Sequence, residues 1–159
     1  MREQIHNINV VAKEKLPSPK ALKATLPLSR SARKTVLQTR KTLMSILDGK
    51  DDRLVIVVGP CSIHDTGLAI DYAERLKTLA KAVEDKFLIL MRVYFEKPRT
   101  TTGWKGLIND PNIDDTFQID KGVHIARSLM IQLNEMGLGV ATEAPVSYTH
   151  LRAHETRED

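Results

Sequence analysis

The stretch Leu54-Val-Ile-Val-Val58, followed at once by Gly59-Pro60, decides the fold class of this chain. Five consecutive apolar residues, four of them β-branched, are typical of a strand in a parallel sheet that helices cover on both faces. The glycine and the proline end the run. We therefore predict a β-strand over 54–58, buried on both faces, in an α/β fold.

The sequence on the carboxyl side of this strand alternates between helices and strands. Asp65 can cap a helix whose apolar residues recur every three or four positions as far as Val83. The elements after it are predicted to be a strand over Phe87–Val93, a loop over 94–116, a helix over Phe117–Met136 and a third strand over Gly139–Glu143. This order is typical of right-handed βαβ units in a parallel sheet.

The residues before the first strand are predicted to be an arm and two helices. Residues 1–17 are polar and irregular. Ser18-Pro19 can begin a short helix that Pro27 ends, and a second helix is predicted from Ser31 to Leu47. Three strands with two connecting helices do not complete an α/β domain, because a (β/α)8 barrel takes about 250 residues and a doubly wound sheet usually needs about five or six strands.

The composition narrows the class of protein. Of 159 residues, 42% are hydrophobic and 28% are charged, as in an ordinary globular protein. Because no apolar run approaches the roughly 20 residues of a membrane helix and no signal peptide is visible, we expect a cytoplasmic protein without a membrane partner. The net charge of +4 favours anionic partners. Lysines and arginines are spread along the chain rather than clustered, and aromatic residues are few, which argues against a nucleic-acid binder. The single cysteine, Cys61, excludes an internal disulfide.

The first candidates for a site are the residues that follow the three predicted strands, because parallel α/β folds place their sites at the carboxyl ends of strands. If the strands are neighbours, one rim is shared by Cys61, Arg92, Lys97, Arg99 and Glu143. The segment 91–106 carries four cations within fourteen residues, offset only by Glu96. Such cations, with nearby threonines and glycines, predict a site for one or two small anions, and the alternative is a solvated basic loop.

Other rim residues leave more than one interpretation open. Cys61 could be a nucleophile with His64 as its base, a metal ligand, or a buried inert cysteine. His64 itself is expected to be a local hydrogen-bonding residue. Glu143 could act as an acid or base, orient a water, or pair with a rim cation. Trp104 is predicted to pack and pin the loop.

Three strings of residues stand in the same order as in a known family. They are Gly59-Pro-Cys-Ser-Ile-His-Asp65, Met91-Arg-Val-Tyr-Phe-Glu-Lys-Pro-Arg-Thr100 and Gly103-Trp-Lys-Gly-Leu-Ile-Asn-Asp-Pro111. They resemble the bacterial type I family of 3-deoxy-D-arabino-heptulosonate 7-phosphate (DAHP) synthases. The resemblance covers about residues 1–144, and the segments 22–29 and 141–144 are most similar to the tyrosine-sensitive isoenzyme.

The resemblance implies a (β/α)8 TIM barrel. Residues 1–50 would be an N-terminal arm with helices, and residues 51–144 the first βα units, with about three strands. It implies a transferase that condenses phosphoenolpyruvate with erythrose 4-phosphate and releases phosphate, as the first step of the shikimate pathway. A divalent metal ion (Mn, Fe, Co or Zn) would polarise the aldehyde. A homo-oligomer and an aromatic amino acid effector, tyrosine, are also implied.

The resemblance also assigns roles to particular residues. Cys61 is implied to be a metal ligand. The residues implied to bind substrate are Arg92 and Lys97 for phosphoenolpyruvate, and Pro98, Arg99 and Thr100 for erythrose 4-phosphate. Lys97 lies near the reacting aldehyde and Glu143 contacts an active-site water, so both are classed as catalytic. Asn7 lies near the position at which the family's N-terminal arm reaches a neighbouring subunit's inhibitor pocket.

The family pattern stops at Pro145. Residues 145–159 lack the apolar period of a helix and resemble translated sequencing-adapter DNA, so we predict a non-native tail and assign no role to His150 and His154. The family's other metal ligands, a His, a Glu and an Asp, find no match in this chain. We therefore expect the isolated chain to be inactive and poorly folded. The first alternative is a non-catalytic module that binds phosphorylated metabolites or has a regulatory role. The second, which ranks far below it, is a nucleic-acid binder.

Overall fold

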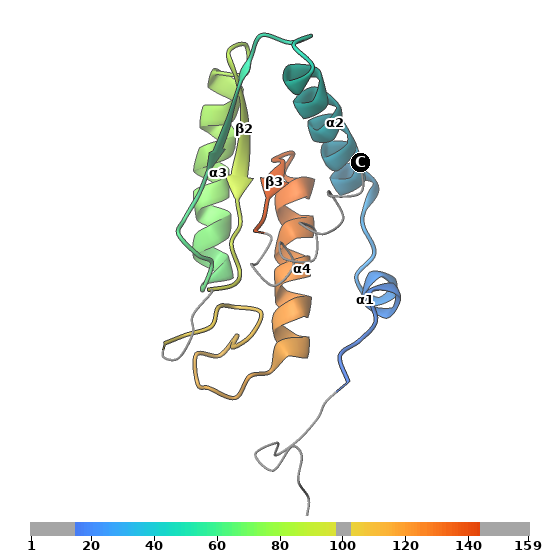
Figure 1. Cartoon of the computed structure of the whole chain (residues 1–159), viewed down its shortest axis with the longest axis vertical. Coiled ribbons are helices and arrows are strands. Elements are labelled where there is room, and N and C mark those ends of the chain that lie inside the picture. The colour runs from blue at the N-terminus through green and yellow to red at the C-terminus, as the bar shows by residue number, and fades with distance from the viewer. Residues whose placement is uncertain (1–14, 98–102, 144–159) are drawn as a thin grey trace, which may run out of the picture.

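The strand β1 (Leu54–Val58) forms over the residues predicted for it and is one of three parallel strands. It pairs with β2 (Phe87–Arg92), with Leu54 opposite Phe87, and β2 pairs in turn with β3 (Val140–Ala141). The strand order is therefore β1-β2-β3 (Figure 1). The computed structural model describes residues 15–97 and 103–143, and within them it confirms the predicted alternation of strands and helices.

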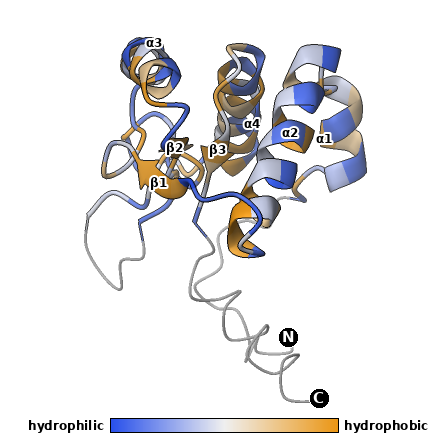
Figure 2. Ribbon diagram, turned by 90° about the horizontal axis from the view of Figure 1, so that it is seen from above, coloured by the Kyte–Doolittle hydropathy of each residue, from blue (hydrophilic) through white to orange (hydrophobic). Residues whose placement is uncertain are grey.

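Two helices connect the strands and two precede them. The connecting helices α3 (Thr66–Ala82) and α4 (Ile119–Glu135) lie on the same side of the sheet (Figure 2). The helix α2 (Arg30–Leu47) packs against α4, and the short α1 (Pro19–Thr25) comes before it. Within the described ranges, no helix is long and apolar enough to cross a membrane.

Three helices begin at side-chain caps, and two of these caps follow the sequence prediction. The Ser18 hydroxyl accepts a hydrogen bond from the backbone N–H of Ala21, and the Asp65 carboxylate accepts one from Leu68. The helix α2 begins one residue earlier than predicted, because the Ser29 hydroxyl caps it by accepting from the N–H of Ala32. Each cap satisfies a backbone N–H that the first turn leaves unpaired.

The core lies between the sheet and the two connecting helices. It is formed by the central strand with the inner faces of α3 and α4, and its members include Ile89, Met91, Val93, Ala73, Leu76, Ala126, Leu129 and Leu133. The burial of each large apolar side chain contributes about 1.5–3 kcal/mol to folding. This packing fixes α3 and α4 on the sheet and so fixes the positions of the strand ends that carry the candidate site.

The prediction that residues 54–58 are buried on both faces is wrong for the described part of the chain. Leu54 is 64% exposed and Val57 is 49% exposed. The physical reason is that β1 is an edge strand, which in the described sheet has β2 on one side only. Both described connecting helices also cover a single face of the sheet (Figure 2).

Two predicted boundaries also need correction. The helix α4 starts at Ile119 rather than Phe117, because Phe117 has a φ of +52° and so cannot begin a right-handed helix. Ile113 and Asp115, with φ of +59° and +58°, share this left-handed conformation. The third strand is limited to Val140–Ala141 instead of Gly139–Glu143, because only those residues pair with β2.

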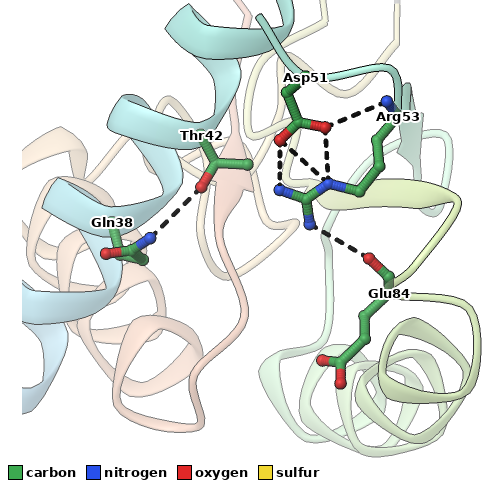
Figure 3. Close-up of polar contacts among 5 residues, drawn as sticks. All are labelled: Gln38, Thr42, Asp51, Arg53 and Glu84. Carbon is green, nitrogen blue, oxygen red and sulfur yellow. Dashed lines mark hydrogen bonds and ion pairs between the residues drawn. The ribbon is translucent and has the colours of Figure 1, made fainter.

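At the amino end of the sheet, Arg53 joins two connections that are distant in sequence. Its guanidinium donates hydrogen bonds to both carboxylate oxygens of Asp51 and, through Nη1, to the carbonyl oxygen of Glu84 at 3.2 Å (Figure 3). The hydrogen bond from Arg53 is the main reason why the pKa of Asp51 is lowered. This fork links the residue that precedes β1 to the turn that precedes β2.

Candidate active site

Arg92, the last residue of β2, ties the ends of the first two strands together. Its Nη2 donates to the carbonyl oxygens of Gly59 at 3.2 Å and Pro60 at 3.0 Å, and its Nε donates to Pro60 at 3.3 Å. The guanidinium also lies over the ring of Tyr94, 4.9 Å from its centroid. A Cβ at position 59 would lie 2.3 Å from the Arg92 carbonyl oxygen, so this close approach requires glycine.

Lys97 and Cys61 come together across the same rim. The backbone N–H of Lys97 donates to the carbonyl oxygen of Lys105, and Glu96 forms an antiparallel bridge with Gly106. The bridge returns the loop onto the end of β2 and places Lys97 Nζ 3.0 Å from Cys61 Sγ. Because Cys61 is exposed, the interpretation as a buried inert cysteine is wrong.

Glu143 follows β3 and binds the backbone of the segment after β2. Its Oε1 accepts hydrogen bonds from the N–H groups of Phe95 at 2.7 Å and Glu96 at 2.6 Å. The Thr142 hydroxyl lies 2.7 Å from Oε2. Among the described residues Glu143 forms no ion pair, so the alternative in which it pairs with a rim cation finds no support in this part of the structure.

Glu96 is a rim residue that the sequence analysis missed. The pKa of its carboxyl is raised, first because the group is partly buried and then because the negative charge of Glu143 is near. The sequence counted Glu96 only as an offset to the basic charge of the loop. No local signal could have found the pair, because Glu96 and Glu143 are 47 residues apart.

The loop after the rim is held by the partly buried Trp104 and the buried Asp110. The indole N–H of Trp104 donates to the carbonyl oxygen of Asp110 at 2.7 Å, which confirms that Trp104 pins the loop. Asp110 is only 2% exposed, and its carboxylate accepts from the N–H groups of Asp114 and Asp115 at 3.3 Å each. At Gly106, with φ of +104°, a Cβ would lie 2.2 Å from the Phe95 carbonyl oxygen.

Other predicted site residues are not brought to the rim. His64 is exposed and makes no hydrogen bond within the described part of the chain, so the expected local bond is absent there. Several predictions fall on residues outside the described ranges, namely Asn7, Pro98, Arg99, Thr100, His150, His154 and the tail 145–159. Among the residues that the structure describes, no group of three His, Cys, Asp or Glu side chains could hold a metal ion.

The arrangement defines a class of protein. Two cations and a thiol meet at the carboxyl ends of neighbouring parallel strands, and a strand-end carboxylate fixes the backbone between them. This is the geometry of an α/β protein whose rim can bind small phosphorylated or carboxylated anions. The chain belongs to the DAHP synthetase I family, whose model matches residues 25–150.

Individual relatives agree with the family. The chain is 48% identical over 143 residues to the Tyr-sensitive phospho-2-dehydro-3-deoxyheptonate aldolase of Escherichia coli, covering 90% of this chain and 40% of the relative. It is 53% identical over 131 residues to the Phe-sensitive enzyme of the same organism, covering 82% and 37%. A solved structure of the aldolase from Francisella tularensis superposes with a TM-score of 0.82 at 47% identity, covering 86% of this chain and 40% of that one. The chain thus spans about two fifths of the length of these relatives.

Proposed function

We propose that this chain is part of an enzyme that condenses phosphoenolpyruvate with erythrose 4-phosphate to DAHP and phosphate. One observation carries the proposal: Lys97 Nζ lies 3.0 Å from Cys61 Sγ, next to the carbonyl of Pro60 to which the Arg92 guanidinium donates. Both contacts join the ends of β1 and β2. In this proposal residues 51–144 are the first βα units of a (β/α)8 barrel and residues 1–50 are its N-terminal extension. The names of the relatives support the reaction.

Arg92 and Lys97 are proposed to bind phosphoenolpyruvate. Arg92 uses Nε and Nη2 on backbone carbonyls, which leaves Nη1 without a hydrogen bond to any described residue and able to meet a substrate oxygen. Lys97 supplies a point charge beside Cys61, the residue that follows the two carbonyls bound by Arg92. Two cations held in fixed positions bind an anion with little reorganisation, which is how sites of this kind stabilise developing charge.

The second substrate and the water are proposed to meet the neighbouring residues. Pro98, Arg99 and Thr100 follow Lys97 directly in the chain and are the proposed site for erythrose 4-phosphate. The enol carbon of phosphoenolpyruvate would attack the aldehyde carbon, water would add at the adjacent carbon, and phosphate would leave. Glu143 is proposed to orient that water, since Oε1 is occupied by two N–H donors and the carboxylate is held rigidly.

The proposed metal chemistry is only partly represented in the described residues. Cys61 offers one thiolate ligand for a divalent ion such as Mn, Fe, Co or Zn, but the described residues contain no group of three ligands. They do not by themselves fit a metal site, because such ions take several ligands. We therefore expect the isolated 159-residue chain to show no turnover when phosphoenolpyruvate consumption is assayed with erythrose 4-phosphate and Mn²⁺.

Regulation and assembly belong to the same proposal. The names of the Tyr-sensitive and Phe-sensitive relatives support an aromatic amino acid as effector, and we favour tyrosine. Asn7 is the proposed contact in the arm, and a homo-oligomer is the proposed assembly.

A chimera tests the function of this chain's own residues. Residues 15–143 of this chain replace the matching segment of the Escherichia coli Tyr-sensitive relative. The consumption of phosphoenolpyruvate is then measured with erythrose 4-phosphate. We expect activity in the chimera and a loss of more than about 100-fold on Arg92→Ala or Lys97→Ala. Arg75→Ala, which removes an exposed cation on α3, is the matched control and should leave activity unchanged. A folded chimera without activity would count against the proposed reaction.

A further inference from the structure

The helix α2 carries a basic face that no other part of the described chain covers. Its 18 residues include five cations and no acid. Four of these cations recur at helical spacing with two apolar residues, so they share one side of the helix. The opposite side, which includes the fully buried Ala32, packs on α4. The basic face consists of the exposed residues Arg30, Arg33, Lys34, Leu37, Lys41 and Met44.

The cations of the basic face have no anionic partner among the described residues. Their side chains form no hydrogen bond or ion pair there. Arg30 lies three and four positions from Arg33 and Lys34, a spacing at which like charges destabilise a helix. With Leu37 and Gln38, the four cations line an open hollow of about 400 Å³. Apolar side chains surrounded by positive charge fit a partner that is both apolar and acidic.

The loop before α4 has this complementary character. Between Ile113, which is 58% exposed, and Phe117, which is 49% exposed, lie the exposed acids Asp114 and Asp115. Neither acid forms an ion pair with a described residue. The hydrogen bond from the Thr116 side chain is the main reason why the pKa of Asp114 is lowered, so this carboxylate keeps its charge. The loop 113–117 therefore presents apolar side chains and negative charge together.

The loop is also held in one conformation. The buried carboxylate of Asp110 accepts hydrogen bonds from the N–H groups of Asp114 and Asp115. Ile113, with φ of +59°, occupies a left-handed conformation that β-branched residues rarely adopt. Such conformations persist where the surrounding structure holds them, and they gather at functional sites. A surface that is fixed in advance loses little freedom on binding.

Within one copy the two surfaces lie apart. Figure 1 shows the loop before α4 at one end of the molecule and α2 toward the other end. Figure 2 shows α2 at the end of the row of helices, beyond α4. A second copy in the opposite orientation can bring its loop to the basic face and receive the first copy's loop on its own. The same contact then forms twice, as in a closed two-fold dimer.

We propose that the basic face of α2 binds the loop 113–117 of a second copy of this chain. The two acids of the loop meet cations of the face, and the exposed apolar side chains of the two surfaces pack together. The proposal rests on the homo-oligomer proposed above and names the surfaces that form it. Neither surface includes a residue assigned to the reaction at the rim.

Charge reversal on each surface tests the contact by sedimentation of the full chain. One variant carries Arg33→Glu and Lys34→Glu, and the other carries Asp115→Lys, whose carboxylate accepts no hydrogen bond from a described residue. Each variant alone should associate at least about tenfold more weakly than the wild type. Their equimolar mixture should recover association, because the reversed face meets the reversed loop and the two unchanged surfaces meet each other. A mixture that associates no better than the separate variants would overturn the proposal.

Two controls separate the contact from net charge and from loop strain. Lys77→Glu with Lys81→Glu makes the same charge change on exposed positions of α3 and should leave the dissociation constant within about twofold. Equal weakening by this control would mean non-specific attraction and would refute the contact. Asp115→Asn removes the charge but keeps a residue that tolerates the left-handed conformation, so it should also weaken association. Copies that stay apart while the basic face binds DNA or phosphatidylglycerol vesicles would assign it to another partner.

Cross-linking with a carbodiimide gives a second measurement, which needs no variant. The reagent joins a lysine amine to a carboxylate in contact with it. Mixed ¹⁴N- and ¹⁵N-labelled copies should give peptides of mixed isotope composition that link Lys34 or Lys41 to an acid of the loop. The same reaction on the chimera decides the question if the chain alone is unfolded. Oligomers without these links would overturn the contact and leave the proposed homo-oligomer standing, whereas a chain that stays monomeric at every concentration would overturn both.

Discussion

Gly122 offers the sharpest test of the packing that supports the rim. It lies in the first turn of α4, where alanine would ordinarily raise helix stability by about 0.5–1 kcal/mol relative to glycine. Here a Cβ would lie 2.1 Å from the carbonyl oxygen of Ile108 and 2.6 Å from that of Leu107. Both neighbours are backbone atoms of the loop that returns to the rim, so neither can swing aside as a side chain would.

The magnitude follows from how far the backbone must move. Ordinary contact begins at about 3.4 Å, so α4 and the Ile108 carbonyl must separate by more than 1 Å on Gly122→Ala. Overpacking of this kind costs about 1–3 kcal/mol, against which the helix gain is small. We expect a net loss of about 2 kcal/mol in the free energy of unfolding, or a fall in Tm of roughly 4–8 °C.

Urea unfolding followed by circular dichroism measures this change, and Gly67→Ala is the matched control. Gly67 also lies in the first turn of a helix, α3, but its Cβ would meet only the side-chain oxygen of Asp65 at 3.2 Å. The control should be neutral or stabilising by up to about 1 kcal/mol. If Gly122→Ala is as stable as the control, the close contact between α4 and the loop does not exist, and the reasoning fails.

Three further changes test the polar contacts. Glu143→Ala should lower the free energy of unfolding by about 2 kcal/mol and speed hydrogen exchange at the Phe95 and Glu96 amides, because both amides lose their acceptor. Unchanged exchange at both amides would contradict the two hydrogen bonds to Glu143. Glu96→Gln should stabilise the chain near pH 7 but not below about pH 4. The raised pKa means that the folded chain binds this proton more tightly, so stability falls as pH rises through the folded-state pKa; urea midpoints that do not depend on pH would disprove it. Arg53→Lys should raise the pKa of Asp51 toward its usual value, checked by ¹³C NMR titration, and a constant pKa would exclude the guanidinium fork as the cause.

Local patterns in the sequence gave the element order and several element ends. The apolar run 54–58 became β1 without a shift, and the caps at Ser18 and Asp65 formed as expected. These features depend on residues within a few positions of one another. The start of α4 escaped prediction because the left-handed conformation of Phe117 is set by the loop before it, and no glycine marks the position.

Part of the candidate site could likewise be predicted from the sequence, and part could not. The residue types and strand ends in the sequence were enough to predict that Cys61, Arg92 and Lys97 share a rim, because parallel strands that follow one another carry their carboxyl ends on one edge. Their actual partners were not predictable. The 3.0 Å contact between Lys97 and Cys61 spans 36 residues, and it depends on how the bridge at Gly106 folds the loop back.

The sequence by itself thus determined the fold class, the family and the chemistry available at the strand ends, because these are written in local periodicity and in contiguous strings of residues. The tertiary structure alone decided that β1 is exposed at the edge of the described sheet and that the Glu143 carboxylate accepts hydrogen bonds from the amides of Phe95 and Glu96. It alone also buried Asn134 Oδ1 without a hydrogen-bond partner among the described residues. The physical reason is common to all three: burial and hydrogen-bond partners depend on strand register and helix packing between residues far apart in the chain.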